Sequence, residues 1–302
     1  MADLVSICVC TYRREMLRRT LASLARLTMP PGKDIEVVVV DNDGDCSARS
    51  VVSDFADSVP FQVVYVVEHN KGLSFARNRG LETAKGQWIS LIDDDEVAEP
   101  DWLARLLETA ERFRADAVVG AVLPEFEGSP PAWVVRSRFF DRPLPPAGTK
   151  IGMGIALSGN TLLRADFLGQ RNLRFDPDFN FTGGEDSDFF RRFTDLGGTV
   201  VSAPDAIVRE FVPSHRMTAE HLSKVSLWIG EIYARLTHRH GGLMVTAANV
   251  PRAAFNLIIA TLLMAVSFPF GRDWYYRYYL LVLRNAGKFR YYLGLSPIEM
   301  YR

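Results

Sequence analysis

Cysteine is scarce in this sequence: three cysteines occur in 302 residues, and no two of them form a Cys-x-x-Cys pair. Cys8 and Cys10 stand two apart in an apolar run, so on a strand they would share one face and pack as small hydrophobic residues. This pattern excludes a disulfide-stapled scaffold and suits a reducing cytosol. No basic leader precedes the short apolar stretch at 4–10, so we expect no secretory signal there.

Net charge is almost absent as well. The sequence has 35 Lys and Arg against 36 Asp and Glu, a formal charge of -1. A nucleic-acid-binding domain normally carries a clear basic excess, so we expect no nucleic-acid partner. The balance is uneven, because residues 251–302 hold seven basic and two acidic residues (+5), whereas the residues before them hold 28 and 34 (-6). An acidic body is therefore followed by a basic tail.

What the sequence does contain is an ordinary globular share of apolar residues, 48%. A chain of about 300 residues buries roughly three quarters of its unfolded surface, so it can fold without a disulfide or a metal. The first half alternates short β-branched runs with segments of helical spacing, the pattern of a mostly parallel sheet with crossover helices. We expect an α/β fold with strands at 5–10, 35–40, 62–67, 88–92 and 117–122, and helices at 16–27, 74–84 and 101–114.

The second half is less regular. Residues 124–154 are rich in proline, glycine and aromatic residues, which indicates an irregular connector or lid. After this segment we expect a helix that begins near Glu185, short strands around Val200 and Val208, and a helix from about 218 to 238.

An uncharged segment lies near the C-terminus. Residues 253–271 carry no formal charge, and as a helix these nineteen residues would be about 28 Å long, close to the thickness of a bilayer core. Trp274 and four tyrosines follow directly, as in an interfacial aromatic belt. A buried core helix is the alternative, because Asn256, Thr261 and Ser267 dilute the apolar signal. The pattern favours membrane contact.

The segment after it limits the possible membrane topologies. Arg277, Arg284, Lys288 and Arg290 are too many charges for a membrane span, and their excess favours the cytoplasmic side. With the soluble body also cytoplasmic, both flanks of the apolar segment lie on one side. We therefore expect a peripheral, interfacial or re-entrant helix at the cytoplasmic face of the inner (plasma) membrane.

Four consecutive acids directly follow the predicted strand at 88–92: Asp93, Asp94, Asp95 and Glu96. Ligands of open α/β sheets bind at the carboxyl ends of strands, and like charges gathered there destabilise the fold unless a positive group compensates. Mg²⁺ or Mn²⁺ is the usual compensation for oxygen ligands. The alternative is an acidic turn that caps the helix after Pro100.

A second acidic segment, Glu185-Asp186-Ser187-Asp188, follows Gly183 and Gly184 and begins a predicted helix. Acids in a first helical turn are favoured by the helix dipole, which by itself would explain them. One of these acids, if it faced a cleft, would instead serve as a general base.

Polar clusters also follow the other predicted strands. Lys71, Arg77 and Arg79 begin the helix after the third strand, where a helix N-terminus suits a phosphate or a nucleobase carbonyl; a solvated helix face is the alternative. Residues 11–13 follow the first strand and residues 41–43 follow the second. Four successive strands thus end in polar clusters, and together they predict a ligand site.

These segments, taken in order, resemble the family 2 glycosyltransferases of the GT-A fold. The resemblance covers about residues 5–214. The segments that carry it are the opening strand with Thr11-Tyr12-Arg13-Arg14, Val37-Val38-Val39-Val40-Asp41-Asn42, residues 70–78, Asp93-Asp94-Asp95 and Glu185-Asp186. Within the family, Asp93-Asp94-Asp95-Glu96 and Gly183-Gly184-Glu185-Asp186 are similar to bacterial exopolysaccharide glucosyltransferases of the succinoglycan type.

The resemblance implies a division of the chain. Residues 1–123 would be the nucleotide-sugar-binding half of a GT-A domain. Residues 124–250 would be the half that binds the acceptor and carries the catalytic base. Residues 251–302 would form an apolar and basic-aromatic helical tail, associated with the membrane.

The resemblance also implies donor-binding roles. The nucleotide pocket would be lined by Thr11, Tyr12 and Arg13, with Asp41 and Asn42 near the base, although some relatives have a second carboxylate where Asn42 stands. Arg77 would help to hold the nucleotide, and Asp94 belongs to the same set. Asp93 and Asp95 match the Asp-x-Asp motif: Asp95 would bind Mg²⁺ or Mn²⁺ most directly, and Asp93 would face the ribose or the metal.

On the acceptor side, Asp186 matches the position of the catalytic base, and Glu185 would contact the acceptor. Gly159 and Asn160 fall where relatives shape the sugar or acceptor pocket. His215 would be a further metal ligand, as in some GT-A enzymes, although a lone histidine after a strand is more often structural. Arg191 and Arg192 would either meet the pyrophosphate or pair with Glu185 or Asp188 along their helix.

The implied reaction is an inverting transfer of a sugar from a UDP-sugar donor to a lipid-linked saccharide acceptor, in the synthesis of exopolysaccharide or cell-surface polysaccharide. The subfamily likeness favours glucose. A sugar nucleotidyltransferase is one alternative, but its glycine-rich phosphate loop is missing, because Thr11-Tyr12-Arg13-Arg14 contains no glycine. A catalytically silent, membrane-associated scaffold is another, against which the presence of Asp93, Asp95 and Asp186 argues.

Overall fold

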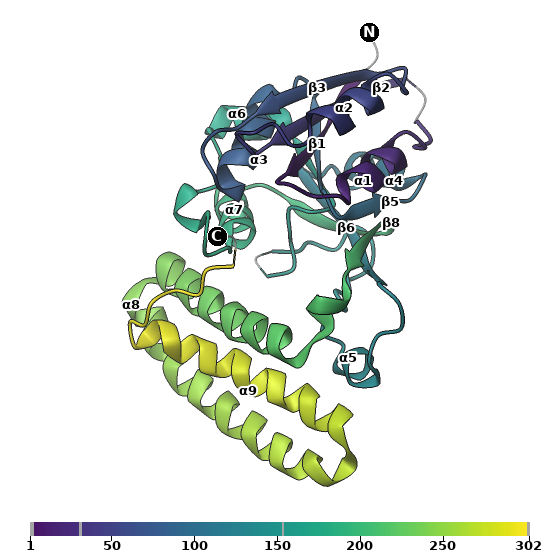
Figure 1. Ribbon diagram of the computed structural model, residues 1–302. Helices are drawn as coiled ribbons and strands as arrows, with labels where there is room; N and C mark the ends of the chain where they lie inside the picture. Colours follow the sequence, from purple (N-terminus) through teal and green to yellow (C-terminus); the bar gives the residue numbers. More distant parts are fainter. Residues whose placement is uncertain (1–2, 30–31, 153, 301–302) are drawn as a thin grey trace.

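Apolar runs of the first half form the parallel centre of a sheet (Figure 1). β1 (Asp3–Thr11), β2 (Lys33–Asp41), β3 (Gln62–Val67) and β4 (Trp88–Asp93) are parallel neighbours in the order β3-β2-β1-β4. Their nearly continuous apolar sequence is what a sheet covered on both faces requires. The structure is a computed structural model that describes residues 3–29, 32–152 and 154–300, and it confirms the expected α/β fold.

The second half of the sheet is mixed. β7 (Thr161–Arg164) runs antiparallel to both β4 and β6 (Ala117–Phe126), while β8 (Val200–Val212) is parallel to β6 and antiparallel to β5 (Glu96–Ala98). The complete strand order is β3-β2-β1-β4-β7-β6-β8-β5. The two short strands expected around Val200 and Val208 are one continuous strand, because a register shift at Gly120/Ala121 of β6 absorbs the irregularity between them.

Helices cover both faces of the sheet, and alternate side chains of β1 and β2 point to opposite faces. α1 (Leu17–Leu24), α2 (Arg49–Ala56) and α4 (Trp102–Phe113) pack against one face, where Val5, Ile7 and Val9 are buried. α3 (Leu73–Thr83), α6 (Ala165–Arg171) and α7 (Glu185–Asp195) pack against the other, with Cys8, Val38 and Val40. The short helices α2 and α6 were not expected from the sequence.

The segment between β6 and β7 is mostly irregular, as its proline and glycine content predicts. It contains the short helix α5 (Ala132–Ser137). Two 3-10 turns, η1 (Pro177–Phe179) and η2 (Ser214–Met217), precede α7 and α8 respectively.

The C-terminal part is a unit of long helices that lies below the α/β body in Figure 1. α8 (Ala219–Ser267) is followed by η3 (Phe268–Phe270) and α9 (Arg272–Tyr292). The helix expected at 218–238 therefore continues much further, but its backbone breaks at Gly242, where φ is 67° and the chain reverses direction. We call residues 219–241 the proximal part of α8 and residues 243–267 its distal part. The expected domain boundaries at 123/124 and 250/251 fall inside β6 and the distal part of α8.

α9 packs closely on α8. A Cβ atom added at Gly230 would collide with the carbonyl oxygen of Arg284, and one added at Gly287 would collide with that of Leu227. Glycine is therefore required at both positions for the two backbones to approach this closely. A small apolar cluster that includes Val134, Val212 and Leu280 attaches the helical unit to α5 and β8.

Strand register determines where the polar clusters meet. Thr11 pairs with Asp41 across β1 and β2, and Cys10 pairs with Asp93 across β1 and β4. The strands thus end at one edge of the sheet, so the side chains that follow them are brought together there.

Candidate active site

A cleft with a volume of about 1390 Å³ opens at the carboxyl ends of β1 and β4. Residues that follow the strands, among them Thr11, Asn42 and Asp93, line one side of it. The N-terminus of α7 and parts of α8 and α9 line the other side. The cleft therefore joins the polar strand ends to the helical unit.

Arg77 in α3 connects the two acidic segments of the sequence. Its Nη1 donates hydrogen bonds to Glu185 (2.5 Å) and Asp186 (2.9 Å), and its Nη2 lies 3.4 Å from an Asp93 oxygen. The side chain is only 6% exposed. Burial lowers the pKa of Arg77, but Asp186, Glu185 and Asp93 together hold this pKa well above its ordinary value. Arg77 thus stays cationic and holds the acids of β4 and α7 at one place.

Asp94 also lines the cleft, although its side chain is mostly buried. It accepts a hydrogen bond from Thr11 Oγ1 (2.6 Å), and the Arg14 guanidinium lies 3.9 Å away. Burial raises the pKa of Asp94 to about 7 in spite of both contacts. Asp94 and Thr11 therefore join the ends of β4 and β1.

Asp95 lies beside a cation that the sequence analysis did not single out. An Arg216 nitrogen from η2 is 3.4 Å from an Asp95 oxygen, and the same guanidinium is 3.5 Å from Glu210. Burial and, after it, the charge of Glu210 raise the pKa of Asp95. Arg216 thus partly neutralises an acidic pair in the cleft.

Glu96 supports the acidic segment from inside. Its Oε2 accepts a hydrogen bond from the Asp93 amide (3.0 Å), and burial followed by the charge of Asp93 raises the pKa of Glu96 well above its ordinary value. Gly159 leaves space for both acids, because a Cβ at this position would lie 2.8 Å from an oxygen of each.

The N-terminus of α7 presents Glu185 and Asp186 to the cleft. Gly183 and Gly184 adopt positive φ angles of 73° and 94°, which glycine allows and which turn the chain into the helix. Burial, then the charge of Asp186, raises the pKa of Glu185 to about 7. Within the described residues Glu185 Oε2 is buried without a hydrogen-bond partner. Asp186, whose side chain is 18% exposed, is the more accessible of the two acids.

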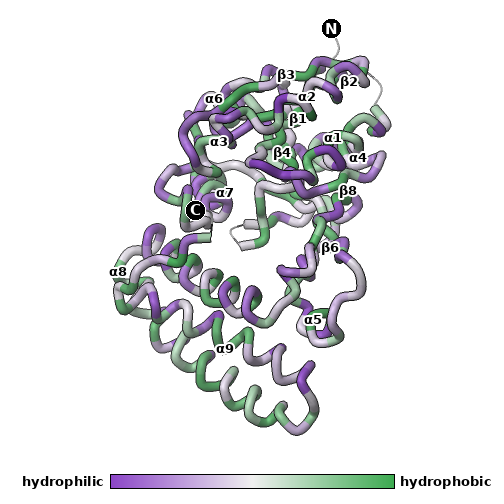
Figure 2. Tube along the Cα trace, viewed as in Figure 1, coloured by the Kyte–Doolittle hydropathy of each residue, from purple (hydrophilic) through white to green (hydrophobic). Residues whose placement is uncertain are grey.

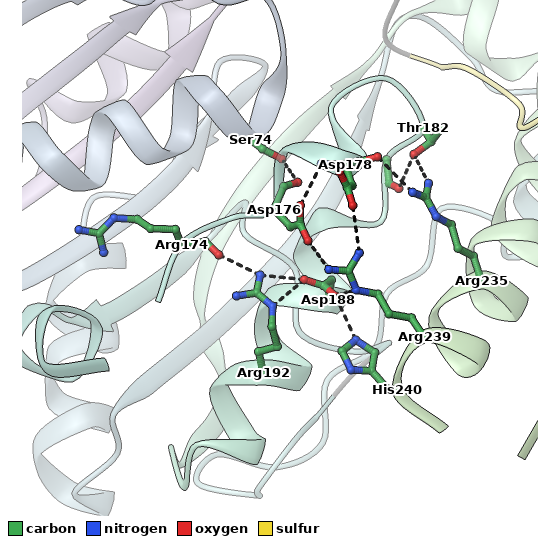
Figure 3. A network of polar contacts seen from close by, with 11 residues as sticks. Ser74, Arg174, Asp176, Asp178, Thr182, Asp188, Arg192, Arg235, Arg239 and His240 are labelled. Atoms are coloured by element: carbon green, nitrogen blue, oxygen red, sulfur yellow. Dashed lines mark hydrogen bonds and ion pairs between the residues drawn. The ribbon is translucent and has the colours of Figure 1, made fainter. Parts of the chain in front are cut away.

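A polar network fixes the orientation of α7 relative to α8 (Figure 3). The fully buried Asp188 contacts Arg192 (2.7 Å) on its own helix and Arg239 (3.3 Å) and His240 (3.0 Å) at the end of the proximal part of α8. Arg239 also pairs with Asp176. Because Asp188 is one turn from the first residue of α7, this network positions Glu185 and Asp186 as well.

The predicted nucleotide side of the cleft contains an exposed aromatic ring. Tyr12 is 40% exposed, and Lys71 Nζ lies 4.9 Å from the centre of its ring. Arg13 donates hydrogen bonds to Asp43 (2.8 Å) and Asp45 (2.6 Å), so its guanidinium stabilises the loop after β2.

Asp41 and Asn42 differ in their positions. Asn42 lines the cleft, accepts from the Gly72 amide (2.8 Å) and donates to two carbonyl groups of residues 68–70. Asp41 is fully buried, and its carboxylate accepts from the Ala48 amide (2.8 Å) and from Tyr65 Oη (2.7 Å). In this structure Asp41 therefore organises the loop after β2 and does not line the cleft.

Two further predicted residues lie elsewhere. Asn160 is fully buried, and its side chain accepts from Trp102 Nε1 (2.6 Å) and donates to two backbone carbonyls. His215 is exposed and packs edge-on against the ring of His221, 6.4 Å between centres, while its neighbour Arg216 enters the cleft. The structure thus brings neither Asn160 nor His215 to the acidic segment.

In this structure both arginines of α7 pair with acids of their own helix: Arg192 with Asp188, one of the two acids expected, and Arg191 with Asp195, which was not expected. Arg191 contacts Asp195 (2.9 Å) and Arg192 contacts Asp188. Both pairs are one helical turn apart along α7.

Sequence reasoning missed several residues of the cleft. Arg216 and Glu210 come together only because η2 follows β8 at the sheet edge. The lining contributed by α8 and α9 depends on the reversal at Gly242; it includes Trp228, Ile232, Arg252, Arg284, Lys288 and Tyr292. For the basic residues of this lining, the only signal in the sequence was the basic excess of residues 251–302.

The acids of β4 fit a divalent cation that arrives with a ligand. Across residues 3–29, 32–152 and 154–300, no three His, Cys, Asp or Glu side chains form a complete metal site. Asp93 and Asp95 nevertheless line the cleft, and burial raises the pKa of each. Mg²⁺ and Mn²⁺ commonly bind one or two carboxylates and complete their shell with phosphate oxygens. These two carboxylates suit a cation bound to a nucleoside diphosphate.

Comparison with known sequences gives a consistent picture. Residues 6–171 match the family described as Glycosyl transferase family 2. The chain is 35% identical over 306 residues to the succinoglycan biosynthesis protein ExoM of Rhizobium meliloti (strain 1021), covering 98% of this chain and 95% of that protein. It is also 35% identical over 140 residues to the glucosyl-dolichyl phosphate glucuronosyltransferase of Haloferax volcanii, covering 45% of this chain and 41% of that protein.

Solved structures share the fold. The mannosyltransferase PcManGT of Pyrobaculum calidifontis, determined with GDP-Man and Mn²⁺, aligns with a TM-score of 0.66 at 18% identity over 97% of this chain and 88% of that one. TarS 1-349 of S. aureus, determined with UDP, aligns with a TM-score of 0.54 at 18% identity over 97% and 92%.

Proposed function

The chain belongs to glycosyl transferase family 2, and from this premise we propose that it moves a sugar, glucose, from a UDP-sugar to a lipid-linked oligosaccharide with inversion at the anomeric carbon. The process served would be the synthesis of exopolysaccharide or another cell-surface polysaccharide. One observation carries the proposal: Arg77 gathers Asp93, Glu185 and Asp186 at one edge of the cleft. Acids for the donor and an acid for the acceptor thus lie side by side.

The relatives support this substrate class. ExoM, which matches nearly the whole chain, takes part in succinoglycan biosynthesis, and succinoglycan is a polysaccharide. TarS was determined with UDP and with UDP-GlcNAc, and PcManGT with GDP-Man and Mn²⁺. A nucleotide-sugar donor and a divalent cation are therefore the first ligands to test.

On the donor side, the exposed ring of Tyr12 and the amide of Asn42 would contact the base, with Thr11 and Arg13 shaping the same wall. Asp93 and Asp95 would hold Mg²⁺ or Mn²⁺, whose contribution when bound is to stabilise the negative charge on the leaving UDP. Arg77 would keep Asp93 in place, because it is itself fixed by Glu185.

On the acceptor side, Asp186 would act as the general base. It would take the proton of the acceptor hydroxyl while that oxygen attacks the anomeric carbon from the face opposite UDP. The bond between the anomeric carbon and the phosphate oxygen breaks, and its electron pair leaves with UDP. The Glu185 oxygen that forms no hydrogen bond with any described residue would orient the acceptor hydroxyl. Positioning and electrostatics would supply much of the acceleration, since no covalent intermediate forms.

Membrane association is the third part of the proposal. The helix at 219–270 is long and apolar enough to cross a membrane, and only 17% of its most apolar stretch is buried in the protein. Figure 2 shows apolar positions along the distal part of α8, where Ile258, Leu262 and Val266 are each more than half exposed. Their spacing places them on one face of the helix. This face would lie on the cytoplasmic surface of the inner membrane.

The donor site is tested by calorimetric titration of UDP into the full-length protein, with Mn²⁺ and with EDTA. We expect metal-dependent binding that Asp93→Asn/Asp95→Asn removes. The control is Asp54→Asn/Asp57→Asn, an equal change of charge on the exposed side of α2. Failure of UDP to bind under every condition would contradict the proposal. Release of UDP, and not of pyrophosphate, during turnover would separate sugar transfer from nucleotidyl transfer.

A further inference from the structure

Three basic side chains of the helical unit line the cleft without an acidic partner. They are Arg252 from the distal part of α8 and Arg284 and Lys288 from α9. No ion pair within the described part of the chain involves any of them; Lys288 Nζ donates to Asn285 Oδ1 (2.9 Å) and lies 5.0 Å from the centre of the Tyr233 ring. We call these residues, together with Tyr292, the cationic site.

Burial makes this arrangement costly. Burial lowers the pKa of Lys288, and the charges of Arg284 and Arg252 lower it further, which places the three cations within mutual electrostatic reach. Burial alone lowers the pKa of Arg284. Buried charges in proteins are normally paired. Here two partly buried cations, Arg284 and Lys288, lie near each other and near the exposed Arg252 without an acidic partner among the described residues.

Two buried hydrogen-bond donors of the cationic site are also unused. Arg284 Nε and Tyr292 Oη are inaccessible to solvent, and neither has a partner among the described residues. An unsatisfied buried polar group destabilises the folded protein. Both residues line the cleft, so a small rotation of either side chain would bring its donor to a ligand there.

Most other cations of the cleft have acidic partners; Lys71, 4.9 Å from the centre of the Tyr12 ring, is the exception within the described part of the chain. Arg77 is bound by three carboxylates, Arg216 contacts Asp95 and Glu210, and Arg142 pairs with Glu210 at 3.0 Å. Arg290, on the same helix as the cationic site, pairs with Glu231 at 3.1 Å. Of the four cleft cations that form no ion pair with a described residue, three thus lie on α8 and α9.

We propose that the cationic site binds the phosphate or diphosphate group of the lipid-linked acceptor. The inference rests on the proposed function and adds to it the place where the acceptor is held. An anion with two or more charges would neutralise the three cations and accept hydrogen bonds from Arg284 and Tyr292.

The surroundings match such an acceptor at both ends. The saccharide would extend along the cleft from the cationic site to Asp186, since one continuous cleft contains both. The lipid chain would leave in the other direction, along the distal part of α8. There the exposed side chains Phe255, Ile258 and Ile259 begin three residues after Arg252.

The test is calorimetric titration of geranyl diphosphate, a soluble lipid diphosphate, into the full-length protein in EDTA. Without a divalent cation the acids at Asp93 and Asp95 repel diphosphates, so binding reports on the cationic site. We expect Arg284→Gln/Lys288→Gln to weaken binding at least tenfold. The matched control is Arg272→Gln/Arg277→Gln, which removes two charges from α9 outside the cleft. Tyr292→Phe, which removes one hydroxyl, should weaken binding severalfold without altering the fold.

Further titrations compare other ligands that carry an anion or a lipid chain. They also test this inference separately from the proposed function. Geraniol should not bind, inorganic pyrophosphate should bind more weakly than geranyl diphosphate, and phosphatidylglycerol vesicles should not compete for the site. Asp93→Asn/Asp95→Asn should keep the binding of geranyl diphosphate while it loses that of UDP. Arg284→Gln/Lys288→Gln should keep UDP binding with Mn²⁺.

The inference is overturned if Arg284→Gln/Lys288→Gln and Tyr292→Phe both bind geranyl diphosphate like the wild type, or if the control pair weakens binding equally. If the wild type does not bind UDP, the donor assignment is wrong. The titration of geranyl diphosphate would still test the cationic site.

Discussion

Arg77 in α3 and Glu185 in α7 lie 108 positions apart in the sequence, yet they form a 2.5 Å ion pair between side chains that are 6% and 4% exposed. The same guanidinium contacts Asp186 and Asp93. A single buried cation therefore sets the distance between the proposed donor acids and the proposed base. Any change at position 77 should affect stability, donor binding and transfer together.

The first prediction concerns this cation. Arg77→Ala leaves Glu185, Asp186 and Asp93 without their shared partner, and removal of one member of a buried ion pair costs about 3–5 kcal/mol. Urea unfolding monitored by circular dichroism should show a loss of this order. Arg79→Ala, an exposed change on the same helix, should stay within about 0.5 kcal/mol. Equal stability of the two variants would show that the ion-pair cluster contributes little.

The second prediction assigns the base. Asp186→Asn keeps the shape of the side chain but cannot accept a proton, so sugar transfer should fall by about 10²–10⁴-fold while UDP affinity changes little. Transfer is measured as UDP release with a lipid-linked acceptor, and affinity by calorimetry. Asp195→Asn, at the other end of α7, is the control and should transfer normally. Near wild-type transfer by Asp186→Asn would make the assignment wrong.

The third prediction is a pH dependence of stability in EDTA. The pKa of Asp94 is raised from 3.8 to about 7 in the folded protein, because burial disfavours the carboxylate. Below pH 3.8 Asp94 is protonated in the folded and the unfolded protein, so it does not lower the free energy of unfolding. As the pH rises from 3.8 to about 7, the unfolded protein loses this proton while the folded protein keeps it, so the free energy of unfolding falls. Above about 7 the loss is complete. Asp94→Asn should raise the free energy of unfolding more at pH 8 than at pH 5, by on the order of 2 kcal/mol.

Thermal and urea unfolding of the wild type, Asp94→Asn and the exposed variant Asp57→Asn at the two pH values measure this difference. Asp57→Asn should change stability equally at both. A gain for Asp94→Asn that is the same at pH 5 and pH 8 would contradict the effect attributed to burial.

The fourth prediction concerns the membrane. Ile258→Ser/Leu262→Ser/Val266→Ser removes three exposed apolar side chains from one face of the distal part of α8. Each would contribute about 1.5–3 kcal/mol if fully buried in lipid, so flotation with phosphatidylglycerol vesicles should fall at least tenfold. The control, Leu123→Ser/Val135→Ser/Leu196→Ser, changes equally apolar, exposed positions of the α/β body and α5. If both triple variants float like the wild type, the distal part of α8 is not the membrane-binding face.

Much of the site could be predicted from local sequence. Parallel strands end at one sheet edge, so the polar residues after β1, β2 and β4 had to meet once the strands were identified. The position of Asp94 beside Thr11 follows from this rule. The ion pair of Arg77 does not, because it depends on how α7 packs against α3 after a long irregular segment.

Other features escaped prediction for identifiable reasons. β7 has four residues and carries its antiparallel pairing on both sides, so its sequence gives no periodic signal. The resemblance placed Asp41 near the base; in this structure amide donors and Tyr65 bind its carboxylate inside the loop after β2. The reversal at Gly242 depends on one residue in a long helical sequence, and it is what brings Arg252 beside α9.

The close contact between Gly230 and Gly287 has a consequence for substrate length. With no side chain between them, the two helix backbones interlock and neither can slide or rotate past the other. Arg284 and Lys288 flank this contact on α9, and Asp188 links α7 to Arg239 and His240 of α8, so both cations would keep a constant separation from Asp186. The protein would then select acceptors by length. Among acceptors of increasing length, it would extend those in which the distance from the lipid phosphate to the terminal hydroxyl equals the distance from the cationic site to Asp186.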